Sequence, residues 1–113
     1  MNSANPWKKI YDAIGEAAAL EMVAEEAAEL SATAAKLARI VRGENPTRVD
    51  WDMGYRWLVE EIADVRNALD VVDEGLSNEE TGPITEAIND WMTTKMNRWY
   101  KHLFGEEMPN ETN

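Results

Sequence analysis

Residues 20–41 read LEMVAEEAAELSATAAKLARIV, and this stretch decides the fold class. Its apolar residues recur at spacings of three and four, at positions 20, 23, 27, 30, 34, 37 and 41. That spacing places them along one side of an α-helix. Upstream, Asn5-Pro6 supplies a helix cap and a first helical residue, and Gly15 is a candidate bend or break. The sequence therefore predicts helix from about Trp7 to about Arg42.

Two further segments are also helical by pattern. Gly43 and Pro46 end the first segment, and a second stripe follows at positions 55, 58, 62, 65, 69 and 72. This second helix is predicted to end near Glu74, and its candidate N-caps are Thr47, Asp50 and Asp52.

The third helical segment begins after a polar stretch, residues 75–82. Pro83 opens it, and it runs from Ile84 to about Phe104. No segment alternates with period two over the length of a strand, so we expect an all-α bundle of three to four helices. Residues 1–104 are predicted to form one domain, and 105–113 a flexible polar tail. The second helix carries apolar side chains off its main stripe (Trp57, Ala68, Val71), which favours pairing with a second copy.

Composition excludes several classes of function. The 113 residues include 22 acidic and 11 basic side chains, and the net charge is -11. This charge repels phosphate backbones, so nucleic-acid binding is not expected, and an anionic partner would need a bridging cation. The absence of cysteine excludes disulfides, thiolate zinc sites and cysteine nucleophiles. No stretch approaches the roughly 20 apolar residues of a membrane span, and the polar start lacks a signal-peptide pattern. We therefore expect a cytoplasmic protein without membrane contact.

The most informative motif occurs twice in the chain. Residues 23–30 read VAEEAAEL and residues 58–65 read LVEEIADV, so each helix carries a pair of carboxylates three residues apart. At about 100° per residue, Glu26 and Glu61 each lie roughly 65–70° from the centre of their apolar stripe. Glu29 and Asp64 lie further round in the same sense. When the stripes pack together, both pairs can border one groove.

Four carboxylates around one groove repel one another unless a cation lies between them. Oxygen ligands without histidine or sulfur favour Mg²⁺, Mn²⁺ or Ca²⁺ over zinc or copper. A single acidic pair at this spacing is usually solvated surface, but two matched pairs in one register are much rarer by chance. The sequence therefore predicts a metal site formed by Glu26, Glu29, Glu61 and Asp64.

The two motifs, Glu-Glu-x-x-Glu and Glu-Glu-x-x-Asp on consecutive helices, resemble those of the all-α NTP pyrophosphohydrolase superfamily. The MazG-like proteins are the nearest in pattern, and dimeric dUTPases and dCTP pyrophosphatases belong to the same superfamily. The resemblance covers about Leu20 to Tyr100. It implies a homodimer or homotetramer of helical bundles, with Mg²⁺, or Mn²⁺ as a substitute, held by the four acids just named.

The resemblance also assigns substrate-binding residues. Lys95-Met96-Asn97-Arg98 is similar to the basic segment of the family, so Lys95, Arg98 and Asn97 are expected to contact substrate phosphates. The alternative is a cationic helix end that complements the helix dipole. Related pyrophosphatases place a tryptophan before the second acidic motif, which points to Trp51 for base stacking, with Trp57 as the alternative.

The implied activity is Mg²⁺-dependent hydrolysis of a nucleoside triphosphate to the monophosphate and pyrophosphate. Glu25 and Glu60 stand beside the metal ligands, and either could orient the attacking water or a ligand; Glu25 is the preferred candidate. A second hypothesis is a non-catalytic acidic helical protein that binds a basic partner. A di-iron carboxylate bundle is excluded, because the chain has one histidine and no Glu-x-x-His motif.

Overall fold

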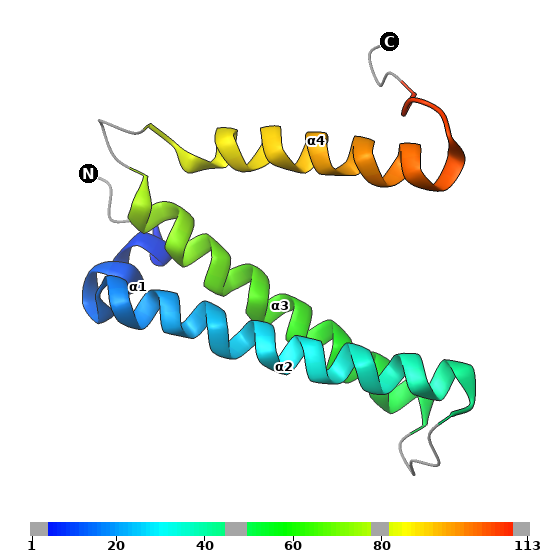
Figure 1. Ribbon diagram of the computed structural model, residues 1–113. Helices are drawn as coiled ribbons and strands as arrows, with labels where there is room; N and C mark the ends of the chain where they lie inside the picture. The colour runs from blue at the N-terminus through cyan, green and yellow to red at the C-terminus, as the bar shows by residue number, and fades with distance from the viewer. Residues whose placement is uncertain (1–4, 45–49, 78–81, 110–113) are drawn as a thin grey trace. The chain divides into compact units, whose positions relative to one another are not determined.

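The computed structural model describes residues 5–44, 50–77 and 82–109, and the regular elements in these ranges are helices (Figure 1). They are α1 (Pro6–Ile14), α2 (Glu16–Arg42), α3 (Trp51–Leu76) and α4 (Ile84–Phe104). The predicted all-α class is confirmed. In the described part of the chain, no helix is both long and apolar enough to span a membrane.

The boundaries of α1 and α2 follow the signals in the sequence. The Asn5 side chain accepts a hydrogen bond from the backbone N–H of Lys8 at 3.0 Å, as an N-cap does. Gly15 breaks the helical run, with φ 91° and ψ 163°, so α1 and α2 are separate helices. Gly43 ends α2 in the left-handed conformation, at φ 72°.

Helix α3 extends further than the sequence suggested. The Asp50 carboxylate accepts a hydrogen bond from the backbone N–H of Met53 at 2.8 Å and so caps its start, while Thr47 lies outside the described residues. The helix ends at Leu76 rather than near Glu74. Gly75 is the next-to-last residue of α3 and lies against the Tyr11 ring of α1, where a larger residue would collide. The close approach of α1 therefore explains why a glycine stands at this position within the helix.

The contacts within the chain divide it into two compact units, one up to Leu76 and one from Ser77 onwards. The first unit contains α1, α2 and α3, and the second contains α4. The domain predicted over residues 1–104 spans both units. Residues 110–113 of the predicted tail lie outside the described residues.

In the first unit, α2 and α3 run antiparallel along each other, and α1 folds back onto α3 (Figure 1). Small residues dominate the seam between the helices, and its buried members are Ala19, Leu37, Gly54, Ala68 and Val71. Ala68 and Val71 are thus covered within the chain, and not by a second copy as their off-stripe positions had suggested.

The seam is rotated relative to the apolar stripes read from the sequence. Leu20, Tyr55 and Leu69 belong to those stripes, yet about half of each side chain is exposed. At about 100° per residue, the buried face of α2 is centred roughly 50° from the centre of its stripe. The stripe is therefore wider than the seam, and its remainder forms an exposed apolar face on the α2–α3 hairpin.

This rotation changes the position of the acidic residues. Glu26 lies about 20° from the Ala19–Leu37 line of α2, and Glu61 about 20° from Gly54 on α3. Both glutamates are half-buried. They belong to the packed seam itself, whereas the sequence placed them at its edge.

Helix α4, in the second unit, has a helical pattern without a core of its own. None of its residues is buried, and several large apolar side chains are exposed, among them Ile88, Trp91, Met92, Trp99 and Leu103. The left-handed Gly105, at φ 72°, ends the helix.

Candidate metal centre

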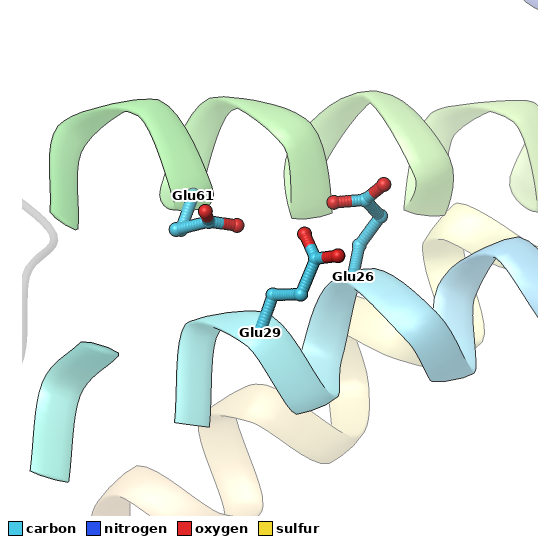
Figure 2. Close-up of side chains that lie close together, drawn as sticks. All are labelled: Glu26, Glu29 and Glu61. Carbon is cyan, nitrogen blue, oxygen red and sulfur yellow. The ribbon is translucent and has the colours of Figure 1, made fainter. Parts of the chain in front are cut away.

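Three of the four predicted ligands converge between α2 and α3. Figure 2 shows the carboxylates of Glu26 and Glu29 on α2 and of Glu61 on α3 turned toward one another. Each offers one oxygen, and these three oxygens lie within 4.8 Å of one another. The match between the two motifs thus corresponds to a real juxtaposition in space.

Two of these carboxylates have an oxygen that is buried without a partner. The Oε2 atoms of Glu26 and Glu61 are hidden from solvent and accept no hydrogen bond. Among the described residues, no ion pair with lysine or arginine reaches the three glutamates. Buried carboxylate oxygens normally have hydrogen-bond donors or cations beside them, so this arrangement is unfavourable for the free protein.

The electrostatics of the cluster agree with its geometry. Desolvation is the main cause that raises the pKa of Glu26 above the usual value of 4.5, and the charges of Glu29 and Asp64 raise it further. Desolvation is likewise the main cause that raises the pKa of Glu61, followed by the charges of Glu29 and Asp64. Both side chains therefore hold a proton more readily than an exposed glutamate does.

The fourth predicted ligand, Asp64, is an exposed neighbour of the cluster. Its charge reaches both Glu26 and Glu61, but its oxygens are not part of the group of three. Of the two glutamates suggested to orient water, Glu60 acts on the cluster, because its charge contributes to the raised pKa of Glu61. Glu25 is exposed on α2.

The three oxygens suit a hard divalent cation. Metal–oxygen distances are near 2.1 Å for Mg²⁺ and 2.4 Å for Ca²⁺, so neighbouring ligands of one ion are about 3.0–3.4 Å apart and opposite ligands about 4.2–4.8 Å apart. Three oxygens that lie within 4.8 Å of one another would have to draw closer together to share one ion. An ion between them would also supply the partner that the two buried Oε2 atoms lack.

The predicted phosphate-binding residues lie on α4, in the second unit. Lys95 lines a pocket of about 390 Å³ together with Met92, Met96, Trp99 and Met108. Arg98 is exposed and Asn97 is half-buried. Their proposed contact with substrate stays a prediction.

Neither of the two tryptophans considered for base stacking belongs to the acidic cluster. Trp51 is the first residue of α3, ten residues before Glu61, which is about 15 Å of helix rise. Its ring is tilted against that of Tyr55, with the ring centroids 6.2 Å apart. Trp57 lies under the Lys36 ammonium, 5.7 Å from the ring centroid.

A pocket that the sequence did not indicate opens directly beside the carboxylates. It has a volume of about 420 Å³, and its lining includes Glu26, Asp64, Trp7, Ile10, Met22 and Asn67. It exists because α1 turns back at Gly15 and lies over α3. The local pattern identified Trp7 only as the start of a helix, since nothing in the sequence reveals the direction in which the chain leaves Gly15.

Comparisons with known proteins add no relative: no protein-family model matches the chain, and searches of curated proteins and of solved structures give no match.

Proposed function

We propose that this protein is a divalent-cation-dependent nucleoside triphosphate pyrophosphohydrolase, which converts a (d)NTP to the (d)NMP and pyrophosphate. The observation that carries the proposal is the convergence of two matching acidic motifs on one point. One oxygen from each of three carboxylates lies within 4.8 Å of the other two, and Glu26 and Glu61 each have an oxygen that is buried without a partner. The resemblance of the motifs to the MazG-like proteins supplies the choice of reaction.

Mg²⁺ is the proposed cofactor and Mn²⁺ a substitute. Glu26, Glu29 and Glu61 would hold the ion, and Asp64 would complete the set from the next turn of α3. A bound cation of this kind neutralises phosphate oxygens and lowers the pKa of a coordinated water.

The protein's own contribution begins with positioning. The seam fixes Glu26 and Glu61 on two packed helices, so their carboxylates need little reorganisation when a ligand arrives. Glu60 is the better candidate for orienting the attacking water, because it is the neighbour whose charge acts on the cluster. Lys95 and Arg98 would neutralise the pyrophosphate that leaves.

The proposal includes a homo-oligomer, either a dimer or a tetramer. Its support is the exposed apolar face of the α2–α3 hairpin, on which Leu20, Tyr55 and Leu69 are each about half exposed. Apolar side chains grouped on one face mark an interaction surface more often than isolated ones do.

The test is metal-dependent pyrophosphate release from a panel of dNTPs and NTPs, measured with Mg²⁺, with Mn²⁺ and with EDTA. The proposal expects release with either metal and none with EDTA. A protein that releases no pyrophosphate from any nucleotide, and whose melting temperature does not respond to millimolar metal, would fit the non-catalytic acidic interaction protein instead.

A further inference from the structure

The pocket beside the acidic cluster has two chemically different ends. Glu26 and Asp64 stand at one end, next to the point where the three carboxylates converge. The rest of the lining is largely apolar and includes the Trp7 ring, Ile10 and Met22. A ligand that fits both ends has a flat uncharged ring and, joined to it, an anionic group that a cation can bind to the carboxylates.

The hydrogen-bonding polarity of the pocket is fixed by two of its residues. The Trp7 indole N–H donates to the amide oxygen of Asn67, with 3.3 Å between Nε1 and Oδ1. An indole N–H can only donate, so the amide of Asn67 must turn its oxygen to Trp7. The NH₂ group, which can only donate, is then what this pocket-lining amide still has to offer a ligand. The amide side chain that lines the pocket therefore matches a hydrogen-bond acceptor on the ligand.

We propose that this pocket is the base subsite, and that Asn67, held by Trp7, selects bases that present a carbonyl oxygen rather than an amino group. The inference rests on the proposed function, which places the triphosphate at the carboxylates. It replaces Trp51 with Trp7 as the aromatic wall for the base. The favoured substrates are nucleotides of the uracil and hypoxanthine type over those of the cytosine and adenine type.

Two pairs of substrates test this polarity. Uracil and cytosine differ at position 4, where one has a carbonyl oxygen and the other an amino group, and hypoxanthine and adenine differ in the same way at position 6. The adjacent ring nitrogen changes with it, from an N–H donor in uracil and hypoxanthine to an acceptor in cytosine and adenine. We expect kcat/KM to be about tenfold higher for dUTP than for dCTP, and for dITP than for dATP. One hydrogen bond gained instead of a clash between two donors is worth about this factor.

Three variants test the mechanism of selection. Asn67→Asp replaces the donor with an acceptor, so the preference should reverse toward dCTP and dATP. Trp7→Phe keeps an aromatic wall but removes the N–H, so the Asn67 amide is free to turn. The ratio of kcat/KM between dUTP and dCTP should then fall toward one. Trp91→Phe is the matched control, an exposed tryptophan on α4 outside the pocket, and should keep the preference of the wild type.

A second readout does not depend on catalysis. The indole N–H signals of the tryptophans are followed by NMR during titration with dUMP in the presence of Mg²⁺, and Trp7→Phe identifies the signal of Trp7. We expect dUMP to shift the Trp7 signal at about tenfold lower concentration than dCMP does. A shift of the Trp7 signal without pyrophosphate release from any dNTP would reject the proposed reaction and support the subsite.

The subsite is rejected if the signal of Trp51 moves and that of Trp7 does not. It is equally rejected if Asn67→Asp and Trp7→Phe both keep the substrate preference of the wild type. Circular dichroism of each variant confirms that the helices remain folded, so that a change in preference is not a consequence of unfolding.

Discussion

Glu26 and Glu61 lower the stability of the helix seam in which they lie. At the scale of single residues, this is the most informative property of the molecule. Alanine or leucine at either position would pack without repulsion. Instead, two carboxylates face each other with an unpartnered oxygen each, and Glu29 adds a third charge. Polar groups that destabilise the folded state are characteristic of functional sites.

The first prediction concerns stability in the absence of metal. Because the pKa of Glu26 is raised in the folded state, folding binds a proton above pH 4.5, the usual value, and stability falls as the pH rises through the raised pKa. Glu26→Gln removes this titration. We expect the variant to melt at a higher temperature than the wild type at pH 7.5 in EDTA, and the difference to vanish near pH 4.

The measurement is thermal unfolding by circular dichroism from pH 4 to pH 8. Glu21→Gln, an exposed glutamate on the same helix, is the control and should follow the wild type. Equal melting temperatures of Glu26→Gln and the wild type across this range would show that the carboxylate carries no penalty.

The second prediction concerns catalysis. Glu61→Gln removes one carboxylate from the cluster and Asp64→Asn removes the one beside it, each with little change in shape. We expect each to lower metal-dependent pyrophosphate release by roughly 100-fold or more. Mutating residues that only hydrogen-bond to metal ligands already lowers metal affinity or activity by about 10–100-fold. The variants should keep the helical content of the wild type. Full activity in both would remove the carboxylates from the mechanism.

At the scale of elements, the fold of the first unit depends on how closely α1 approaches α3. Tyr11 of α1 lies against Gly75 of α3, and Trp7 of α1 donates a hydrogen bond to Asn67, about two turns before Gly75 on α3. These contacts hold α1 over the pocket beside the carboxylates. Gly15 makes the reversal possible, because its φ of 91° is strained for any residue with a side chain.

The third prediction is a change of sign in a double-mutant cycle. Gly75→Ala should displace the Tyr11 ring and destabilise the protein by about 1–3 kcal/mol, as overpacking does. In a Tyr11→Ala background the collision is gone, and the same substitution should stabilise by up to about 1 kcal/mol through helix propensity. Urea unfolding measures both values. A destabilising effect of equal size in both backgrounds would mean that Tyr11 does not contact Gly75.

The sequence predicted the helices well, and the acidic motifs in them, because both are local patterns. The Asn5 cap, the break at Gly15 and the end at Gly43 were all read from single residues. The rotation of the α2–α3 seam was not predictable in this way. The apolar stripe is wide enough for two faces, and only the close approach at Gly54 and Ala68 decides which one α3 covers.

In the candidate site, too, local sequence patterns predicted some features, while others depend on how the helices pack. The pairing of Glu26 and Glu29 with Glu61 was expected from the matched motifs, while the burial of the Oε2 atoms and the position of Trp7 were not. Both depend on contacts between residues far apart in the sequence. Trp7 and Asn67 are separated by 60 positions, and no local pattern links them.

At the scale of the whole molecule, the exposed apolar face of the α2–α3 hairpin leads to the fourth prediction. Leu69 is about half exposed on this face, and Leu69→Glu would place a charge in any interface formed there. We expect the wild type to be a dimer or tetramer, and the variant to dissociate at concentrations where the wild type does not.

Sedimentation velocity over a range of protein concentrations measures this directly. Lys9→Glu, which alters an exposed charge on α1, is the control and should leave the oligomer unchanged. A wild-type protein that sediments as a monomer at all concentrations would show that the face is not used for self-association.

The central claim is that the glutamates of α2 and α3 bind one hard cation together, and Mn²⁺ binding tests it most directly. Isothermal titration of the wild type, Glu26→Gln and Glu61→Gln with Mn²⁺ compares one ligand from each helix. The account predicts saturable binding to the wild type and a loss of affinity of at least about tenfold in both variants. Binding that is absent from the wild type, or that both variants retain unchanged, would contradict it.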